Sequence, residues 1–217
     1  MGEHDAGTDD DFGLEEAYAV ETPDDNRQLY AKWATTYESG FIEEKGYQYH
    51  ERVAAAFAAG PRPEGGTLDV GCGTGIVGAA LRERGVGELD GVDISAEMLE
   101  QAATKGIYTN LIEADLTVGM AVPDDTYAGI TSAGTFTHGH LGPDPLGELV
   151  RVAKPGARGA IGVNAAHFEE RGFAAWFDAA AADGRIGPYE IVRAKVYEAS
   201  DPANADDMSN IVVFEVR

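Results

Sequence analysis

The stretch LDVGCGTG, residues 68–75, constrains the fold of this chain more than any other feature. It places three glycines directly after an apolar run. Such a run predicts a buried strand, and IVGAALRERG (76–85) predicts a helix with a polar outer side. Glycines between a strand and a helix let backbone N–H groups approach a ligand without interference from side chains. The stretch therefore predicts a strand–loop–helix unit with a ligand-binding loop.

Strands and helices alternate along the rest of the chain, separated by glycine and proline. Seven segments have the apolar runs expected of strands: 67–71, 88–95, 107–115, 127–134, 157–164, 189–199 and 210–217. The segments between them that predict helices are 76–85, 96–106, 145–154 and 167–184. The last two strands follow each other without a helix. We therefore expect an α/β fold: a doubly wound, mostly parallel, seven-stranded Rossmann-like sheet with a C-terminal antiparallel hairpin.

Several helix ends carry recognisable signals. Ser95 is expected to cap the helix 96–106, and Asp144 the helix that has Pro145 at its first position. Pro155 and Gly156 are expected to end that second helix before the fifth strand. Before the first strand, 26–41 and 47–60 also have helical spacing of apolar residues.

The formal net charge is −22, and residues 1–26 hold ten of the 38 acidic residues and no lysine or arginine. We expect this segment to be a disordered tail, with an acidic arm that docks a basic partner as the alternative. The remainder, 27–217, is expected to be one domain, with a helical lid at 27–60 and a ligand-binding core at 66–217. Its acidic surface repels phosphate backbones, so we expect no nucleic acid partner. A salt-rich habitat would also account for such a surface.

No run of 18 or more apolar residues occurs, so no membrane span is expected. The N-terminus lacks a basic region followed by an apolar stretch, so we expect no signal peptide. Cys72 is the single cysteine, which suits a reducing cytoplasm. No ligand set with metal-site spacing is evident, so no metal is expected.

The glycine loop has two competing interpretations. Gly73, Gly75 and Gly78 form a G-x-G-x-x-G pattern, and Asp93 lies 20 residues after Gly73, as in a dinucleotide site. An NAD-dependent oxidoreductase is therefore one candidate. Three other features point elsewhere. Gly71 already ends the strand, so the loop begins two residues earlier. Asp69 would oppose a pyrophosphate through like charge, and Asp115 puts a second acid at the end of the third strand.

These motifs, in this order and spacing, resemble those of the class I S-adenosylmethionine (SAM)-dependent methyltransferases. LDVGCGTG is similar to their first motif, GVDIS (91–95) to the second and EADL (113–116) to the third, while LVRVAKPGA (149–157) is similar to the entry to their fifth strand. The resemblance covers roughly 27–217. Within the family, YAKWATTYESGF (30–41) and ISAEMLEQA (94–102) most resemble the small methyltransferase-like proteins of the Williams–Beuren region type.

The resemblance implies a cofactor, SAM, with S-adenosylhomocysteine as product, and it implies cofactor-binding residues. Asp69 would serve the loop and the SAM amino group, Asp93 the ribose hydroxyls and Asp115 the adenine amino group. The other implied contacts are Gly71, Cys72, Gly73, Thr74, Gly75, Ile94, Met98, Ala114, Leu116, Ser132 and Ala133. The aromatic residues Tyr30 and Trp33, with Tyr37 and Tyr47, would form a lid, because aromatic faces attract a sulfonium. The alternative is that this helix only packs on the sheet.

The expected reaction is direct in-line displacement of the methyl group onto a small-molecule acceptor, which needs close placement and exclusion of water. The loop after the fourth strand contains His138 and His140, and we expect one of them, preferably His140, to act as a general base. The alternative is that they only shape the pocket. The fourth strand ends in SAGT rather than in the DPPY or NPPY of many enzymes that methylate nucleic acids or proteins, which favours a small acceptor. A non-enzymatic SAM-binding partner protein is the other alternative.

Overall fold

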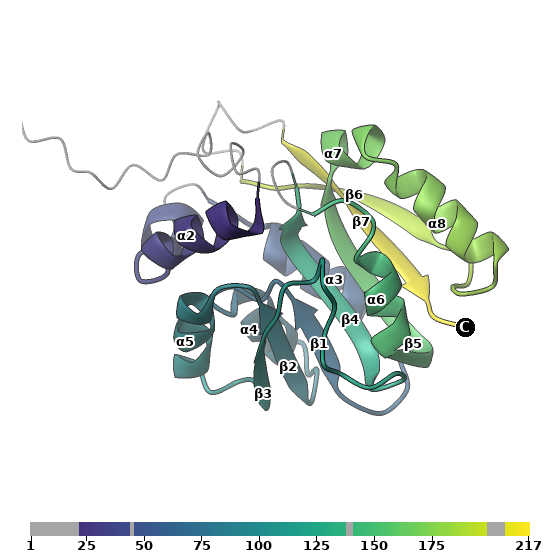
Figure 1. The fold of residues 1–217 in the computed structure, drawn as a ribbon, viewed down its shortest axis with the longest axis horizontal. Coiled ribbons are helices and arrows are strands. Elements are labelled where there is room, and N and C mark those ends of the chain that lie inside the picture. Colours follow the sequence, from purple (N-terminus) through teal and green to yellow (C-terminus); the bar gives the residue numbers. More distant parts are fainter. Residues whose placement is uncertain (1–21, 44–45, 138–140, 199–206) are drawn as a thin grey trace, which may run out of the picture.

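The computed structural model describes residues 22–43, 46–137, 141–198 and 207–217. Its centre is a seven-stranded sheet in the order β3-β2-β1-β4-β5-β7-β6 (Figure 1). The strands are β1 (Thr67–Val70), β2 (Leu89–Asp93), β3 (Asn110–Glu113), β4 (Tyr127–Phe136), β5 (Ala153–Asn164), β6 (Glu190–Lys195) and β7 (Met208–Glu215). The helices are α2 (Pro23–Trp33), the π-helix η1 (Tyr37–Glu43), α3 (Tyr49–Ala58), α4 (Ile76–Glu83), α5 (Ala96–Thr104), α6 (Leu146–Val152), α7 (Ala165–Glu170) and α8 (Phe173–Ala182).

The strand pairing confirms the predicted fold class. Strand β1 pairs in parallel with β2 and β4, β2 with β3, and β4 with β5. Strand β7 lies antiparallel to both β5 and β6. In parallel βαβ units the loops at the carboxyl ends of the strands meet at one edge, and the strand order reverses between β1 and β4. This arrangement brings the loops after β1, β2, β3 and β4 together.

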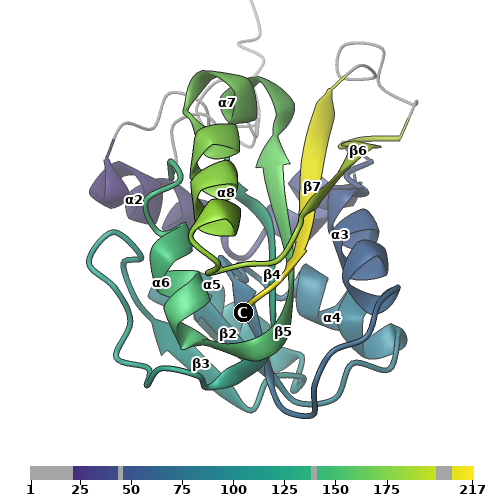
Figure 2. The ribbon, with the colours of Figure 1, turned by 90° about the vertical axis from the view of Figure 1, so that its right-hand side faces the viewer.

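Helices cover both faces of the sheet (Figure 2). On one face, Val53 of α3, Val77 of α4 and Met98 of α5 share a buried cluster. On the other face, Leu149 of α6 and Phe177 of α8 belong to a second buried cluster. Burial of such side chains stabilises the fold by about 1.5–3 kcal/mol each. Because the sheet is buried on both faces, β1 is fully buried along its length, as its apolar run predicts.

Ser95 caps α5 as predicted, since its hydroxyl accepts a hydrogen bond from the Met98 amide at 3.2 Å. The predicted cap at Asp144 is wrong. Pro145 is the residue before the first helical position of α6, and no side chain caps this end. The reason is a turn that precedes the helix, in which the Leu146 amide donates to the Pro143 carbonyl at 3.0 Å.

Two boundaries differ from the sequence predictions. Strand β5 begins at Ala153 and includes Pro155 and Gly156, which were expected to separate a helix from a strand. Ala153 already pairs with Tyr127, and Gly156, at φ 82°, donates its amide to the Val216 carbonyl. The helix predicted at 167–184 is two helices, α7 and α8. The break is at Gly172, whose φ of 80° is a left-handed conformation that cannot continue a helix.

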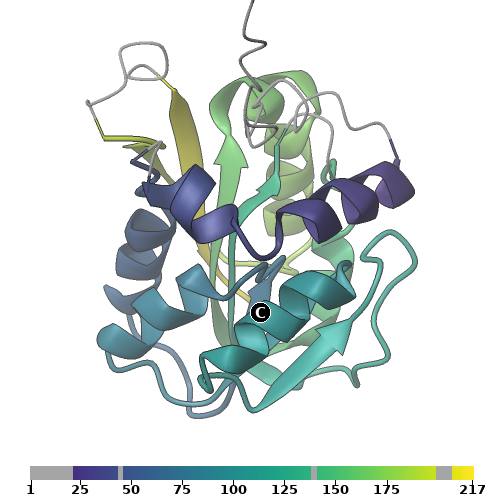
Figure 3. The ribbon, with the colours of Figure 1, turned by 90° about the vertical axis from the view of Figure 1, so that its left-hand side faces the viewer.

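The N-terminal helices α2 and η1 lie over one end of the sheet, with α2 beside α5 (Figure 3). Thr22 and Asp25 form a capping box, with reciprocal hydrogen bonds of 3.1 Å. The predicted boundary at residue 26 therefore falls inside α2, while residues 1–21 lie outside the described residues. No helix within the described ranges is long and apolar enough to cross a membrane.

Candidate active site

A cavity of about 560 Å³ opens at the carboxyl ends of the parallel strands. Its floor is the loop after β1, and its sides are the segments that follow β2 and β3 and the end of β4. Residues of α2 and η1 close it from the N-terminal side. This volume is in the usual range for a small-molecule or cofactor site, about 300–1,000 Å³.

The glycine loop turns sharply at the cavity floor. Gly71 has a φ of 63°, in the left-handed region that favours glycine. A Cβ atom at Gly71 would also lie 2.0 Å from the Thr135 hydroxyl oxygen. That hydroxyl donates to the Val70 carbonyl at 3.0 Å, so the end of β4 holds the last residue of β1. Glycine is thus required at position 71 for two reasons: its left-handed φ, and the lack of space for a Cβ atom beside Thr135.

Asp93 connects the first two loops. Its Oδ2 accepts a hydrogen bond from the Gly73 amide at 2.8 Å, and its Oδ1 accepts one from the Ser95 amide at 3.0 Å. Burial raises the pKa of the Asp93 carboxyl, and these amide hydrogen bonds oppose the shift. Each carboxylate oxygen can accept more than one hydrogen bond, so both oxygens retain capacity for the hydroxyls of a ligand.

Asp69 lies beneath the same loop, in β1, and is completely buried. Its Oδ2 accepts a hydrogen bond from the Tyr108 hydroxyl at 2.6 Å, and its Oδ1 has no hydrogen-bond partner of normal geometry. Burial is the largest cause that raises the pKa of Asp69 to about 7. Asp69 therefore does not reach the cavity surface, and it acts on the site through the loop above it.

The third wall of the cavity is the segment 114–119. Asp115 Oδ1 accepts hydrogen bonds from the amide and hydroxyl of Thr117, at 2.8 and 2.6 Å, which closes a tight turn.

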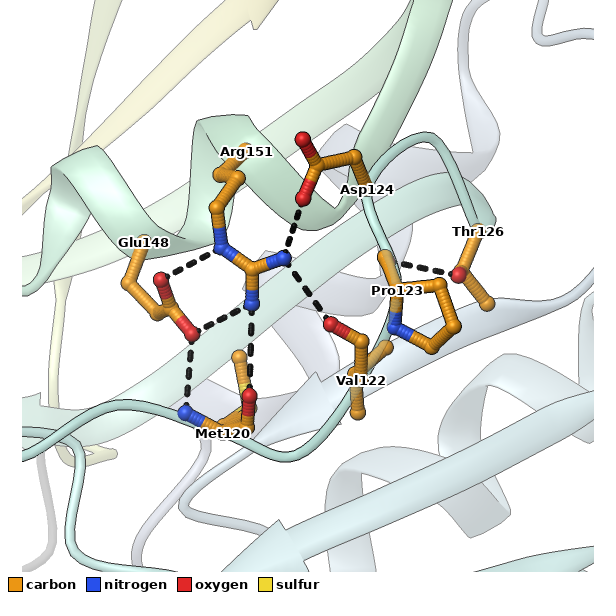
Figure 4. A network of polar contacts seen from close by, with 7 residues as sticks. All are labelled: Met120, Val122, Pro123, Asp124, Thr126, Glu148 and Arg151. Carbon is orange, nitrogen blue, oxygen red and sulfur yellow. Dashed lines mark hydrogen bonds and ion pairs between the residues drawn. The ribbon is translucent and has the colours of Figure 1, made fainter.

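Figure 4 shows how the segment that follows is anchored to α6. Arg151 binds both carboxylate oxygens of Glu148 and donates to the Met120 and Val122 carbonyls. Glu148 also accepts the Met120 amide at 2.8 Å, so its charge is compensated although it lines the cavity.

Aromatic side chains form the N-terminal wall. Tyr30, Tyr37 and Tyr47 line the cavity. Burial, followed by the neighbouring Tyr30, raises the pKa of Tyr37 well above its usual value, so it remains a neutral phenol. Trp33 does not reach the cavity. It is buried within the lid segment with its ring edge-on to Tyr30, at a centroid distance of 5.6 Å.

The structure brings most of the implied cofactor residues to this one cavity. Those that line it are Tyr30, Gly71, Cys72, Gly73, Thr74, Asp93, Ile94, Met98, Ala114, Asp115, Leu116 and Ala133. Four do not: Asp69, Gly75, Ser132 and Trp33. Ser132 is fully buried and donates its hydroxyl to the Val70 carbonyl at 2.9 Å, so it joins β4 to β1.

His138 and His140 lie outside the described residues. Thr135, three residues before His138, and Leu141, which follows His140, both line the cavity. The Leu141 carbonyl lies 2.9 Å from Nε2 of the buried His167, so α7 anchors the second of these residues. Among the described residues, no group of three His, Cys, Asp or Glu side chains is arranged to hold a metal ion.

Sequence reasoning missed Tyr108, Thr135 and Arg151. Each contacts residues far away in the chain, and these contacts cannot be read from the local sequence, even for Thr135 in SAGT and Arg151 in LVRVAKPGA. Position was a signal for Thr135, which is the last residue but one of the fourth strand, at the edge where the predicted loops meet. It was no signal for Tyr108, which lies two residues before the amino end of the third strand.

The charged residues in the described part of the cavity wall are all acidic: Asp93, Asp115, Asp144 and Glu148. Together with neutral tyrosines and loop amides, they suit a ligand that carries positive charge. A pyrophosphate would face these carboxylates at close range, which is unfavourable.

Comparison with known proteins agrees with this arrangement. Residues 67–156 match the family model of the methyltransferase domain. Human methyltransferase-like protein 27 is 39% identical over 100 residues, which is 45% of this chain and 40% of that protein. The chain is thus matched to less than half the length of this relative.

Solved structures share the fold. The methyltransferase in complex with the Trm112 methyltransferase activator of Haloferax volcanii has a TM-score of 0.61 at 18% identity, over 86% of this chain and 97% of that one. The [4+2]-cyclase SpnF has a TM-score of 0.64 at 16% identity, over 91% and 97%. Residues 67–156, which hold the glycine loop, GVDIS and EADL, are thus similar to a methyltransferase domain, and the sheet order β3-β2-β1-β4-β5-β7-β6 accompanies this similarity.

Proposed function

We propose that this protein binds SAM in the 560 Å³ cavity and transfers its methyl group to a small-molecule acceptor by direct in-line displacement. The observation that carries the proposal is the position of Asp93, which holds the Gly73 amide at 2.8 Å in a cavity whose described charged residues are acidic. SAM supplies a methyl group on a cationic sulfonium, which is a good leaving group. The protein then has to bind and orient the two reactants and exclude water from the site.

The described residues fit this cofactor. Asp93 retains acceptor capacity for ribose hydroxyls, and Ile94 and Met98 give an apolar surface next to it for the base. Asp115 would accept an exocyclic amino group through its Oδ2, since both hydrogen bonds from Thr117 go to its Oδ1. The loop amides at the start of α4 favour the carboxylate of the methionine part, because a helix N-terminus carries partial positive charge.

The lid segment supports the choice of a small acceptor. Lys105 at the end of α5 forms an ion pair of 2.8 Å with Glu38 of η1, and Arg27 Nε donates to the Ile94 carbonyl at 3.4 Å. These contacts hold α2 and η1 over the cavity, where Tyr37 and Tyr47 exclude water. A covered, aromatic site suits a neutral or cationic metabolite better than an extended polymer.

We place the reaction in the cytoplasm, because the buried Cys72 is a free thiol.

The proposed general base is His140, with His138 as the alternative. The support is positional, because Thr135, three residues before His138, and Leu141, directly after His140, line the cavity. A thiol or carboxylic acid arrives without its proton, so a base matters only for hydroxyl and amine acceptors. Replacement of His140 by alanine should therefore lower turnover about 100-fold with such an acceptor. Unchanged turnover would end the base proposal.

The test of methyl transfer is an acceptor screen with methyl-labelled SAM and purified protein, with S-adenosylhomocysteine measured as product. Thiols, phenols, amines and carboxylic acids form the panel, and a cell extract stripped of small molecules provides protein acceptors. Label on a small molecule supports the proposal. Label on protein alone contradicts the acceptor class. Binding of SAM without transfer to any acceptor would instead favour a binding protein, and the fold shared with a cyclase makes this outcome worth separating.

A further inference from the structure

We propose that Tyr108 is a positioning residue for the cofactor loop: its hydroxyl holds Asp69 beneath the loop, and its ring supports the start of α4. The inference depends on the proposed function, because it concerns how tightly the cavity binds SAM. Tyr108 touches the loop from below and does not line the cavity.

The hydrogen bond joins a strand of the sheet to a connecting segment outside it. Tyr108 lies in the connection between α5 and β3, and Asp69 lies in β1. The Tyr108 hydroxyl donates to Asp69 Oδ2 at 2.6 Å, a short distance for a charge-assisted bond. Hydrogen bonds to a charged group contribute more to stability than most neutral ones.

The ring packs against the helix that follows the glycine loop. A Cβ atom at Gly75 would lie 3.0 Å from Tyr108 Cε2, and one at Gly78 would lie 2.3 Å from Tyr108 Oη. Gly78 is therefore required because Tyr108 occupies the space beside it. The third glycine of the G-x-G-x-x-G pattern thus has a reason in this chain that involves no pyrophosphate.

The charge of Asp69 depends on this contact. Burial raises its pKa, the Tyr108 hydrogen bond lowers it and the nearby Asp93 raises it again. The other titratable group at this place is the Cys72 thiol, whose pKa burial raises well above its usual value. Without the Tyr108 hydroxyl, the pKa of Asp69 would rise further, so a smaller fraction of Asp69 would be ionised at pH 7. The loop would then have less of the negative charge that favours a cationic ligand.

The experiment compares Tyr108→Phe with Tyr127→Phe by calorimetric titration with SAM between pH 6 and pH 9. Tyr127 is a matched control, because its hydroxyl donates to Asp90 Oδ2 at 2.9 Å from the opposite end of the strands. Tyr108→Phe should weaken SAM binding about ten-fold at pH 7, and the loss should shrink toward pH 9 as Asp69 ionises. Tyr127→Phe should lower the Tm and leave the Kd unchanged.

Two further variants test the route through Asp69. In an Asp69→Asn background, Tyr108→Phe should change the Kd by less than about two-fold, because the charge is already absent. Gly78→Ala keeps Tyr108 but pushes on its hydroxyl, and it should weaken SAM binding at least about five-fold. Gly147→Ala in α6 is its control, because no atom lies within 4 Å of the Cβ that this substitution would add, and it should leave the Kd unchanged.

The outcomes separate the two proposals. If the wild-type protein does not bind SAM, the proposed function fails and the inference fails with it. If the wild type binds and both Tyr108→Phe and Gly78→Ala bind equally well, only the role of Tyr108 is overturned. A loss that is the same at every pH, or that persists in full in the Asp69→Asn background, also contradicts it.

Discussion

Asp93 Oδ2 accepts the Gly73 amide at 2.8 Å, so one carboxylate fixes the loop after β1 from the end of β2. The two residues are 20 positions apart in sequence and adjacent at the cavity floor. Parallel pairing of β1 with β2 brings them together, because it sets both loops at the same edge of the sheet. The cofactor site therefore depends on the register of these two strands.

Asp93→Asn is predicted to weaken SAM binding 10- to 100-fold. The amide side chain cannot reproduce two accepting oxygens, so either the Gly73 or the Ser95 amide loses its partner. Calorimetric titration measures the change. Asp90→Asn, in the same strand but at its other end, is the control and should keep the wild-type Kd. Equal losses in both variants would mean that the effect comes from the strand rather than from the site.

Gly71→Ala is predicted to lower the free energy of unfolding and to abolish SAM binding. Gly85→Ala is its matched control, because Gly85 has a similar φ of 73° but nothing within 4 Å of its would-be Cβ. Both substitutions carry the cost of a left-handed residue, roughly 1–2 kcal/mol. Only Gly71→Ala adds the clash with Thr135. Urea unfolding should therefore place it at least about 1 kcal/mol below Gly85→Ala, and equal stabilities would show that the Thr135 contact relaxes freely.

Stability is predicted to fall as the pH rises from about 4 to about 7. The pKa of Asp69 is 3.8 in the unfolded chain and about 7 in the folded protein, so across this window the folded state holds a proton that the unfolded state has released. One such group lowers the free energy of unfolding by up to about 1.4 kcal/mol per pH unit. The raised pKa values of Asp93 and Asp207 act in the same direction, and the lowered pKa of Glu148 acts against it.

Urea unfolding at several pH values tests this slope. Asp69→Asn should flatten it, leaving the part due to the other three carboxyl groups. Asp178→Asn is the control, because Asp178 is exposed and also accepts a tyrosine hydroxyl, from Tyr189 at 2.6 Å. That variant should keep the wild-type slope. A slope unchanged in Asp69→Asn would mean that this carboxyl is ionised in the folded protein.

The lid is predicted to contribute to SAM affinity through its attachment to α5. Deletion of residues 1–21 should leave the Kd unchanged, because α2 and its Thr22 cap remain. Deletion of residues 1–43 should weaken binding, because Tyr30 and Tyr37 are lost from the cavity wall. Glu38→Gln removes only the ion pair with Lys105 and should raise the Kd about two- to three-fold at low salt, with less effect at high salt. An unchanged Kd after the longer deletion would reject the lid.

The fold was largely predictable because its signals are local. Apolar runs mark the strands, Ser95 marks a helix start, and the two final strands lack a helix between them. One error has a local cause, because Gly172 breaks an otherwise continuous helical pattern. The other has a distant cause, because β5 extends back to Ala153 through its pairing with Tyr127 of β4.

The site was predictable only where a motif carried it. The glycine loop and Asp93 follow from residue types and spacing. Tyr108 and Thr135 do not, because their importance lies in contacts with Asp69 and Gly71 across the sheet. The sequence also could not show that Tyr30 lines the cavity while Trp33 does not. The two residues are three positions apart on a helix and share a face, so packing decides which one reaches the cavity.

The most direct test of the account is titration of the protein with SAM, S-adenosylhomocysteine and NADH in parallel, repeated with Asp93→Asn. The account predicts micromolar binding of the first two, a large loss in the variant and no binding of NADH. Binding of NADH alone would contradict it and assign the glycine loop to a dinucleotide.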